Sequence, residues 1–479
     1  MRKYSAPVDY RRMESLLRDF EPSFEFEPAD QITEAEYADR IERLRRDATV
    51  AGLDAILVHA SLVGWYHTSN PFLRYLCDWM REGVLIIPTD ADLAPELLSF
   101  WTESAVVPPG GEPLLVGEIW QVSPFGRESV DRPGSPLHKT VQACHSVLRR
   151  LGLEGGQIGL IGDDTATSCW AVLRESLPTT AFRDATDMIL RMQRIRSAAE
   201  IDIIRSAGRL IDIGYEAACH VIRPGVTDYE VYAAFSYAQM ARGGENGDGY
   251  QIGVNRYGTH CGKPYGHVIQ NGDLLNLYIS NVTYLGYSAQ AARMVVIGTA
   301  TEKQEEVLEM TVDAVRRAES LIKPGTKFCE LHDAAFEAYV ERGYLKSKET
   351  RTMPFNWEAL PDGSPRPVRR QYVADADWEA QGRRLMHAYP ATPGPHNPNL
   401  GHAIGMPKLP QYNVASHNTD RMEPGMVFVL HAQWVDPLVA GSNLGDLYVV
   451  TDTGFENLTN RTSVEPFRVV DQAGRVQSA

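Results

Sequence analysis

Residues 271–298 read NGDLLNLYISNVTYLGYSAQAARMVVIG, two apolar runs that flank a polar NVTY and an LGY turn. Strand-forming runs on either side of a short Gly-containing turn indicate a β-hairpin. The hairpin carries Asn, Ser, Thr, Tyr and Gln, and after Asp273 it contains no Asp, Glu, His or Cys. It is therefore either a plain structural hairpin or a catalytic hairpin whose charged residues have been replaced.

The bulk properties of the chain narrow its class. With 479 residues it is too long for one compact core, so two domains are expected. A net charge of −15 repels phosphate backbones, so nucleic acid is not an expected partner. No apolar run is long enough to span a membrane, and the N-terminus lacks the apolar segment of a signal peptide. The six cysteines are scattered singly, without a CxxC pair, which is typical of reduced thiols in a cytoplasmic protein.

The first 192 residues predict an α/β domain preceded by an acidic, aromatic arm at about 1–35. The domain's predicted elements are a Thr-capped helix at 32–53, strands at 54–59, 83–88 and 157–162, and a helix at 137–153. Helices that alternate with short apolar strands are the pattern of an α/β layer.

Residues 193–479 predict a second, α+β domain. IRPGVTDYEVYAAF at 222–235 and IKPGTKFCELHDAAF at 322–336 are similar units, which is weak evidence for an internal duplication of helix-plus-strand halves. Residues 345–398 are rich in Pro, Gly and charge and interrupt the pattern. They read either as a lid or interface arm, or as a disordered insertion.

Four pieces of the second half occur in a characteristic order: GTHCGKPYGHVIQNGD at 258–273, the hairpin, LGHAIGMPKLPQYN at 400–413, and MEPGMVFVLHAQWV with NLGDLYVVTDTGFENLT at 422–459. Together with RIRSAAEIDIIRSAG at 194–208, they resemble the creatinase/aminopeptidase P/prolidase superfamily. The resemblance implies an α/β N-terminal domain followed by a pita-bread catalytic domain.

In metal-bearing members of that superfamily, two aspartates, a histidine and two glutamates hold two divalent ions that activate a bridging water. Those five slots fall here, in chain order, at Ile279 (or Tyr278 or Ser280 if a bulge intervenes), Gln290, His402, His431 and Gly445, with Asp446 beside the last. Four of the five ligands are therefore missing. The resemblance thus predicts neither a dinuclear metal centre nor any cofactor.

The pattern is closer to creatinase, the member that works without metal. His260 occupies the slot of its active-site base, and Trp79-Met80-Arg81 resembles the aromatic-x-Arg element that reaches into the partner subunit's site. The two glutamates that grip the guanidinium of creatine are replaced by Ala292 and His431. Because a buried guanidinium without a carboxylate partner is costly, a neutral or anionic substrate is expected instead.

These observations predict a cytoplasmic, homodimeric, metal-independent hydrolase that cleaves a C–N bond of a small polar or anionic metabolite and is not a peptidase. The candidate catalytic residues are His260, His402 and His431, and the candidate substrate-binding residues are Trp79, Arg81, Tyr278, Gln290, Arg293 and Asp446. Three alternatives stay open: a lyase, a remodelled metal site built on the histidines, and a non-catalytic ligand-binding relative.

Overall fold

A computed structural model of the chain describes residues 10–59, 71–79, 83–99, 114–122, 136–162, 167–245, 250–255, 264, 266–345, 358–359, 365–366, 370–373, 385–388, 394–395, 399–406, 412–436, 439–470 and 475–477. The chain divides into two compact units. The N-terminal unit is Asp30–Ile195, and the C-terminal unit joins Arg196–Ala479 to the first residues, Met1–Ala29. The arm that was expected ahead of the first domain therefore packs on the second.

The N-terminal unit is built on a six-stranded sheet with the order β4-β3-β2-β1-β5-β6. Its strands are β1 (Ala55–His59), β2 (Gly83–Pro88), β3 (Glu96–Ser99), β4 (Glu118–Gln121), β5 (Gln157–Gly162) and β6 (Ala181–Asp184). Strands β1 and β5 pair in parallel, whereas β1 and β2 are antiparallel, so the sheet is mixed. Every residue of β1 and β2 is buried, as expected for strands covered on both faces.

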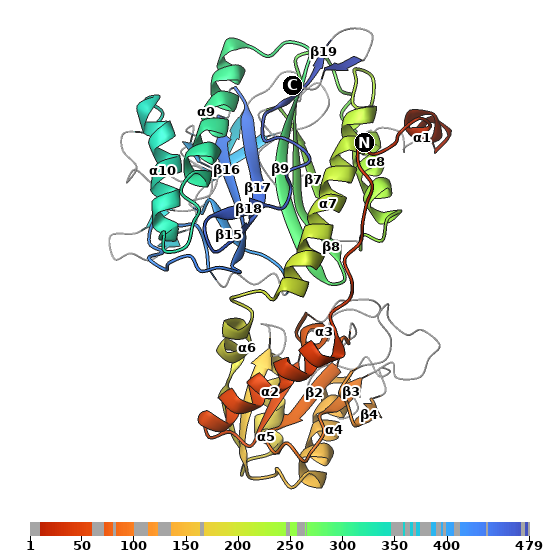
Figure 1. Ribbon diagram of the computed structural model, residues 1–479, viewed down its shortest axis with the longest axis vertical. Coiled ribbons are helices and arrows are strands. Elements are labelled where there is room, and N and C mark those ends of the chain that lie inside the picture. Colours follow the sequence, from red (N-terminus) through yellow and green to blue (C-terminus); the bar gives the residue numbers. More distant parts are fainter. Residues whose placement is uncertain are drawn as a thin grey trace. The chain divides into compact units, whose positions relative to one another are not determined.

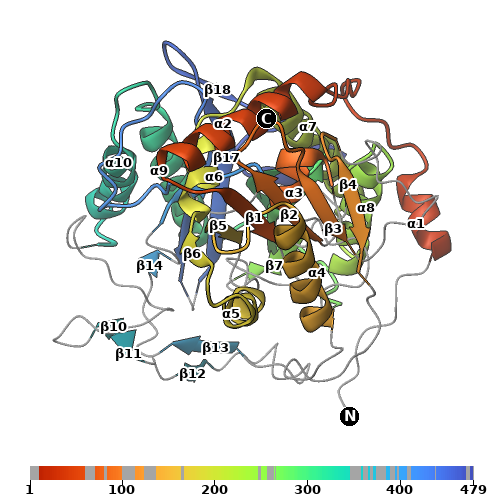
Figure 2. The same ribbon diagram turned by 90° about the horizontal axis from the view of Figure 1, so that it is seen from below.

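Helices cover both faces of this sheet, with α2 on one side and α4 and α5 on the other (Figure 2). The helices are α2 (Glu34–Val50), α3 (Pro71–Cys77), α4 (Pro136–Arg150), α5 (Thr167–Ser176) and α6 (Thr186–Met192). Thr33 caps α2, since its side chain accepts a hydrogen bond from the backbone N–H of Glu36, as its sequence predicts.

The C-terminal unit contains a ten-stranded sheet whose main path is β14-β16-β17-β9-β19-β20. Its strands are β7 (Tyr250–Val254), β8 (Leu274–Tyr284), β9 (Tyr287–Ile297), β14 (Gly394–Pro395), β15 (Gly401–Ala403), β16 (Val427–Val435), β17 (Gly441–Val450), β18 (Phe455–Asn457), β19 (Phe467–Val470) and β20 (Arg475–Gln477). Strands β8 and β9 form the hairpin predicted at 271–298, with a bulge between Ile279 and Val282.

Two similar halves make up this unit. Helices α7 (Ala198–Val221) and α8 (Asp228–Met240) precede the antiparallel strands β7, β8 and β9, and α7 packs on β8 and β9. Helices α9 (Glu302–Glu319) and α10 (Phe328–Glu341) precede β15, β16 and β17, and α9 packs on β16 and β17 (Figure 1). Among the residues that the structure describes, one pair of the two halves is in register, Gly445 with Ala292.

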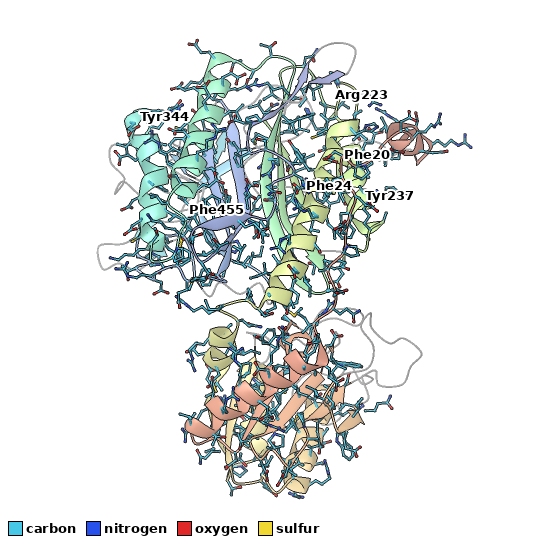
Figure 3. The ribbon with its side chains drawn as sticks, viewed as in Figure 1. Phe20, Phe24, Arg223, Tyr237, Tyr344 and Phe455 are labelled. Atoms are coloured by element: carbon cyan, nitrogen blue, oxygen red, sulfur yellow. The ribbon has the colours of Figure 1, made fainter. Side chains whose placement is uncertain are left out.

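The described part of the arm, residues 10–29, runs antiparallel to α7. It begins with α1 (Tyr10–Leu17), where the Arg12 guanidinium pairs with Glu230 at 2.8 Å and donates to the Gly225 carbonyl. Farther along, the Ser23 backbone N–H donates to the Glu216 carboxylate, and the Ala29 N–H donates to Ser206. Phe20 and Phe24, labelled in Figure 3, pack with Phe26 on a small apolar cluster of α7 and α8.

Few residues of the predicted insertion at 345–398 are described. Four short strands form two antiparallel pairs, β10 (Glu358–Ala359) with β11 (Pro365–Arg366), and β12 (Arg370–Val373) with β13 (Leu385–Ala388), whereas β14 joins the ten-stranded sheet beside β16. Among the described residues, none of the helices combines the length and the apolar character that crossing a membrane requires.

Candidate active site

One cross-strand row runs over four neighbouring strands and consists, in order, of Tyr278, Ala292, Gly445 and His431. Directly paired residues project from the same face of a sheet, so this site row defines a common face. Of the two middle members, Ala292 has only a methyl group and Gly445 has no side chain. The rings at its ends can therefore approach each other, and the centroids of Tyr278 and His431 lie 5.8 Å apart in an edge-to-face contact.

His402 joins the row from β15. A Cβ atom at Gly401 would lie 1.9 Å from the Val429 carbonyl oxygen, so only glycine allows β15 to approach β16 this closely. The neighbouring His402 ring lies with its centroid 6.0 Å from that of His431. The structure thus brings together two of the three predicted catalytic histidines. The third, His260, lies outside the described residues.

The hydrogen bonds at the two histidines favour different tautomers. Nδ1 of His402 lies 2.9 Å from the Ala403 carbonyl, which can only accept, so the neutral ring is protonated at Nδ1 and Nε2 is its basic atom. Nε2 of Gln433 donates to Nδ1 of His431 at 3.1 Å, so that ring carries its proton on Nε2. One ring therefore serves as a proton acceptor and the other as a hydrogen-bond donor.

Tyr278 and Gln290 lie on the same face, because Tyr278 is paired with Ala292 and Gln290 precedes Ala292 by two residues on β9. Nε2 of Gln290 donates to the Tyr278 hydroxyl at 2.8 Å, and both side chains are buried. Burial raises the pKa of Tyr278 to about 12, although the hydrogen bond from Gln290 opposes the rise. The phenol is therefore neutral near pH 7. Ile279 faces the opposite side of the sheet. Of these two candidates for the first metal-ligand slot, Tyr278 is therefore the one that contacts Gln290.

Arg293 and Asp446 occupy the opposite face, because adjacent residues of a strand alternate. Asp446 accepts from Arg293 at 2.6 Å, and the exposed fractions of the two side chains are 1% for Arg293 and 5% for Asp446. The guanidinium also donates to the carbonyls of Ala292, Gly445, Thr459 and Thr462 and to the Thr462 hydroxyl, and Nη2 shares its two hydrogens among three acceptors. Arg293 and Asp446 therefore have a structural role, which corrects the expectation that they bind substrate.

The residues of this face do not fit the two-metal centre of the metal-bearing members that the sequence resembles. Such a centre needs several carboxylates, but Tyr278, Gln290 and Gly445 stand in their slots. A Cβ at Gly445 would lie 2.2 Å from the Leu430 carbonyl oxygen and 2.5 Å from the His431 Cα. The backbone therefore leaves no space for a ligand there. Within the described residues, no group of three His, Cys, Asp or Glu is placed to hold a metal.

Two polar residues of the site were missed in the sequence. Gln433 and Asn443 are directly paired across β16 and β17, and they are 2% and 0% exposed. Gln433 follows His431 by two residues and therefore shares its face. This period of two was readable in VFVLHAQWV. The pairing of Asn443 with Gln433 was not, because it depends on the register between two strands.

The remaining predicted residues belong to the N-terminal unit. Trp79 lies just beyond α3 and is 5% exposed, as expected of a residue that packs in a core. Arg81 lies outside the described residues. Their expected participation in a partner subunit's site stays a prediction.

Comparison with known proteins identifies a protein family that the C-terminal unit matches. Residues 202–452 match the model of metallopeptidase family M24. The chain is 25% identical to the creatinase of Bacillus sp. (strain B-0618) over 327 residues, which cover 66% of this chain and 74% of that protein. It is 24% identical to an Xaa-Pro dipeptidase of Lactobacillus helveticus over 303 residues, which cover 62% and 69% of the two chains.

Solved structures extend the likeness to nearly the whole chain. An X-Pro aminopeptidase from Thermotoga maritima MSB8 superposes with a TM-score of 0.66 at 18% identity, covering 90% of this chain and 99% of that chain. An Xaa-Pro dipeptidase from Bacillus anthracis gives a TM-score of 0.64 at 20% identity, with the same coverage. The predicted fold, an α/β N-terminal domain with a pita-bread C-terminal domain, is confirmed.

Proposed function

Because this chain belongs to metallopeptidase family M24, a family of hydrolases, we propose that it hydrolyses a carbon–nitrogen bond through its histidines rather than through a dinuclear metal centre. One observation carries the proposal. The rings of His402 and His431 lie 6.0 Å apart between centroids, with hydrogen bonds that favour opposite tautomers, on the face where the metal ligands of the family would stand. Acid–base catalysis requires one group that accepts a proton and one that donates a hydrogen, and a basic nitrogen beside an N–H group supplies both.

In the proposed reaction, water adds to the carbon of the C–N bond and loses a proton to a histidine, and that proton is returned to the departing nitrogen. His260 is the proposed base that activates the water, and Nε2 of His402 is a second proton acceptor. The N–H of His431 and the neutral phenol of Tyr278 donate hydrogen bonds to the developing negative charge. Each donor is already oriented by a neighbour, Gln433 for His431 and Gln290 for Tyr278.

The substrate proposed is a small polar metabolite rather than a peptide. Of the relatives named above, the Xaa-Pro dipeptidase would suggest a peptide substrate and the creatinase a small molecule. Membership of the family alone therefore does not decide between these two substrate classes. The absence of carboxylates from the ligand slots favours the small molecule, because peptidase chemistry in this fold needs the two metal ions. We further propose a homodimer in which Arg81 contributes to the neighbouring site.

The test is hydrolysis by purified protein before and after removal of divalent metals with a chelator, using small C–N substrates and Xaa-Pro dipeptides in parallel. We expect turnover of a small substrate that the chelator leaves unchanged. His431→Ala and His402→Ala should each lower kcat by about 10²–10⁴-fold. His417→Ala, at an exposed histidine, is the matched control and should leave kcat unchanged. Activity that appears only after adding back metal, or only on Xaa-Pro dipeptides, would contradict the proposal.

A further inference from the structure

Gln433 and Asn443 form a buried carboxamide pair beside His431. They are directly paired across β16 and β17, and Gln433 holds the His431 ring through its Nε2. Asn443 is completely buried. The pair therefore lies on the face of the site row, at the end of the strands next to His431.

Three polar atoms of this pair lack a hydrogen-bond partner among the residues that the structure describes. They are Oε1 of Gln433 and both Oδ1 and Nδ2 of Asn443. Buried polar groups are nearly always paired in folded proteins, and each unpaired group is destabilising. Three such atoms on two paired residues indicate a bound ligand that forms the missing hydrogen bonds.

The face around the pair is uncharged. In β7, β8, β9, β16 and β17 the only charged residues are Arg293 and Asp446, which pair with each other on the opposite face. An ionised group bound beside Asn443 would therefore meet no countercharge from these strands, and burial of an unpaired charge is strongly unfavourable.

Resting on the proposed function, we propose that the carboxamide pair binds the carbamoyl group of the substrate, –NH–CO–NH₂ or –CO–NH₂. The two unpaired oxygens, on Gln433 and Asn443, accept from the carbamoyl N–H groups, and Nδ2 of Asn443 donates to the carbamoyl oxygen. This inventory of two acceptors and one donor is the complement of a primary carbamoyl group. A guanidinium offers only donors and a positive charge, so Asn443 Nδ2 would face another donor.

The test compares three probes that share an N-linked acetate and differ only at the other end: N-carbamoylglycine, guanidinoacetate and N-acetylglycine. Binding to the full-length protein is measured by isothermal titration calorimetry. We expect N-carbamoylglycine to bind at least about tenfold more tightly than either of the others, because each of them leaves a buried group unpaired. Equal affinities, or no binding of N-carbamoylglycine, would overturn the proposal and would leave water as the occupant of the pair.

Isosteric variants make the test specific to the pair. Asn443→Asp places a carboxylate where Nδ2 stood and should reverse the preference in favour of guanidinoacetate by about tenfold or more. Gln433→Glu is the second variant, in case the first fails to fold, which thermal melting would reveal. Gln142→Glu, at an exposed position of α4, is the matched control and should keep the wild-type preference. Failure of both site variants to shift the preference would also overturn the proposal.

Binding and hydrolysis are measured separately, so the two proposals can fail separately. If N-carbamoylglycine binds with the expected preference but no carbamoyl compound is hydrolysed, the proposed reaction is wrong and the carbamoyl site stands. If a small C–N substrate is hydrolysed without metal but the three probes bind alike, the reaction stands and the carbamoyl site is wrong.

Discussion

At the scale of single residues, Gly445 determines how closely the two ends of the site row approach. It lies between Ala292 and His431 in register, and it offers no side chain to separate the Tyr278 and His431 rings. A Cβ there would collide with the backbone of Leu430 and His431. Any side chain at this position would therefore require β16 and β17 to move apart.

Gly445→Ala should consequently lower the free energy of unfolding by about 1–3 kcal/mol, the usual range for overpacking a buried site. The measurement is urea denaturation followed by tryptophan fluorescence. Gly454→Ala is the matched control, because a Cβ at Gly454 has no atom within 4 Å, and its effect should stay within about 0.5 kcal/mol. Equal effects of the two substitutions would show that β16 and β17 readily move apart at Gly445.

At the scale of elements, the arm at residues 10–29 acts as a strap along the outer side of α7. Its contacts extend from Gly225 and Glu230 at one end to Ser206 at the other. Phe26 also meets Tyr284 at the tip of the β8–β9 hairpin, with ring centroids 6.0 Å apart. Because α7 packs on β8 and β9, the strap supports the hairpin that carries Tyr278 and Gln290.

Phe24→Ala should loosen this strap. The Phe24 ring packs on the apolar cluster of α7 and α8. The guanidinium carbon of Arg461 lies over this ring, 5.3 Å from the ring centroid. Loss of a half-buried aromatic side chain should cost about 1 kcal/mol and speed hydrogen exchange in α7. Tyr237→Ala, whose ring is 66% exposed on α8, is the control and should change neither quantity. Unchanged exchange in the Phe24 variant would mean that α7 does not depend on the arm.

At the scale of the whole C-terminal unit, Arg293 fastens the two halves of the sheet. It reaches from β9 to Gly445 and Asp446 of β17, beside the register pair of Gly445 and Ala292 that joins the two halves. Thr462, which it also contacts, donates to Asp212 of α7 at 2.7 Å. Burial raises the pKa of the Asp212 carboxyl to about 7, against the opposing effect of the Arg293 charge. The cluster thus connects both strands to a helix directly behind the site row.

Arg293→Met should lower the free energy of unfolding by about 3–5 kcal/mol, because it leaves the Asp446 carboxylate buried without its partner. Arg468→Met is the matched control. Arg468 pairs with Glu305 through two bonds of 2.7 and 2.6 Å, but at 44% exposure that pair should contribute no more than about 1 kcal/mol. Thermal and urea unfolding of both variants measure the difference. Similar losses would mean that the Arg293 cluster does not hold the halves together.

Much of the fold was readable from the sequence because it follows from local patterns. The predicted helix at 32–53 corresponds to α2, and the predicted hairpin at 271–298 corresponds to β8 and β9. The arm was placed with the wrong domain, since its aromatic residues could have packed on either unit. Arg293 and Asp446 were assigned to substrate because they adjoin ligand slots, although the alternation of a strand turns such neighbours to opposite faces.

By itself, the sequence determined the main elements of this protein and the residue types that stand in the expected ligand slots, because both depend on local patterns along the chain. The tertiary structure decided which polar residues meet. Tyr278 reaches His431 only through the pairing of β9 with β17, and Asn443 joins Gln433 only through the register of β16 and β17. Such contacts come from the packing of remote segments, and local preferences leave them open.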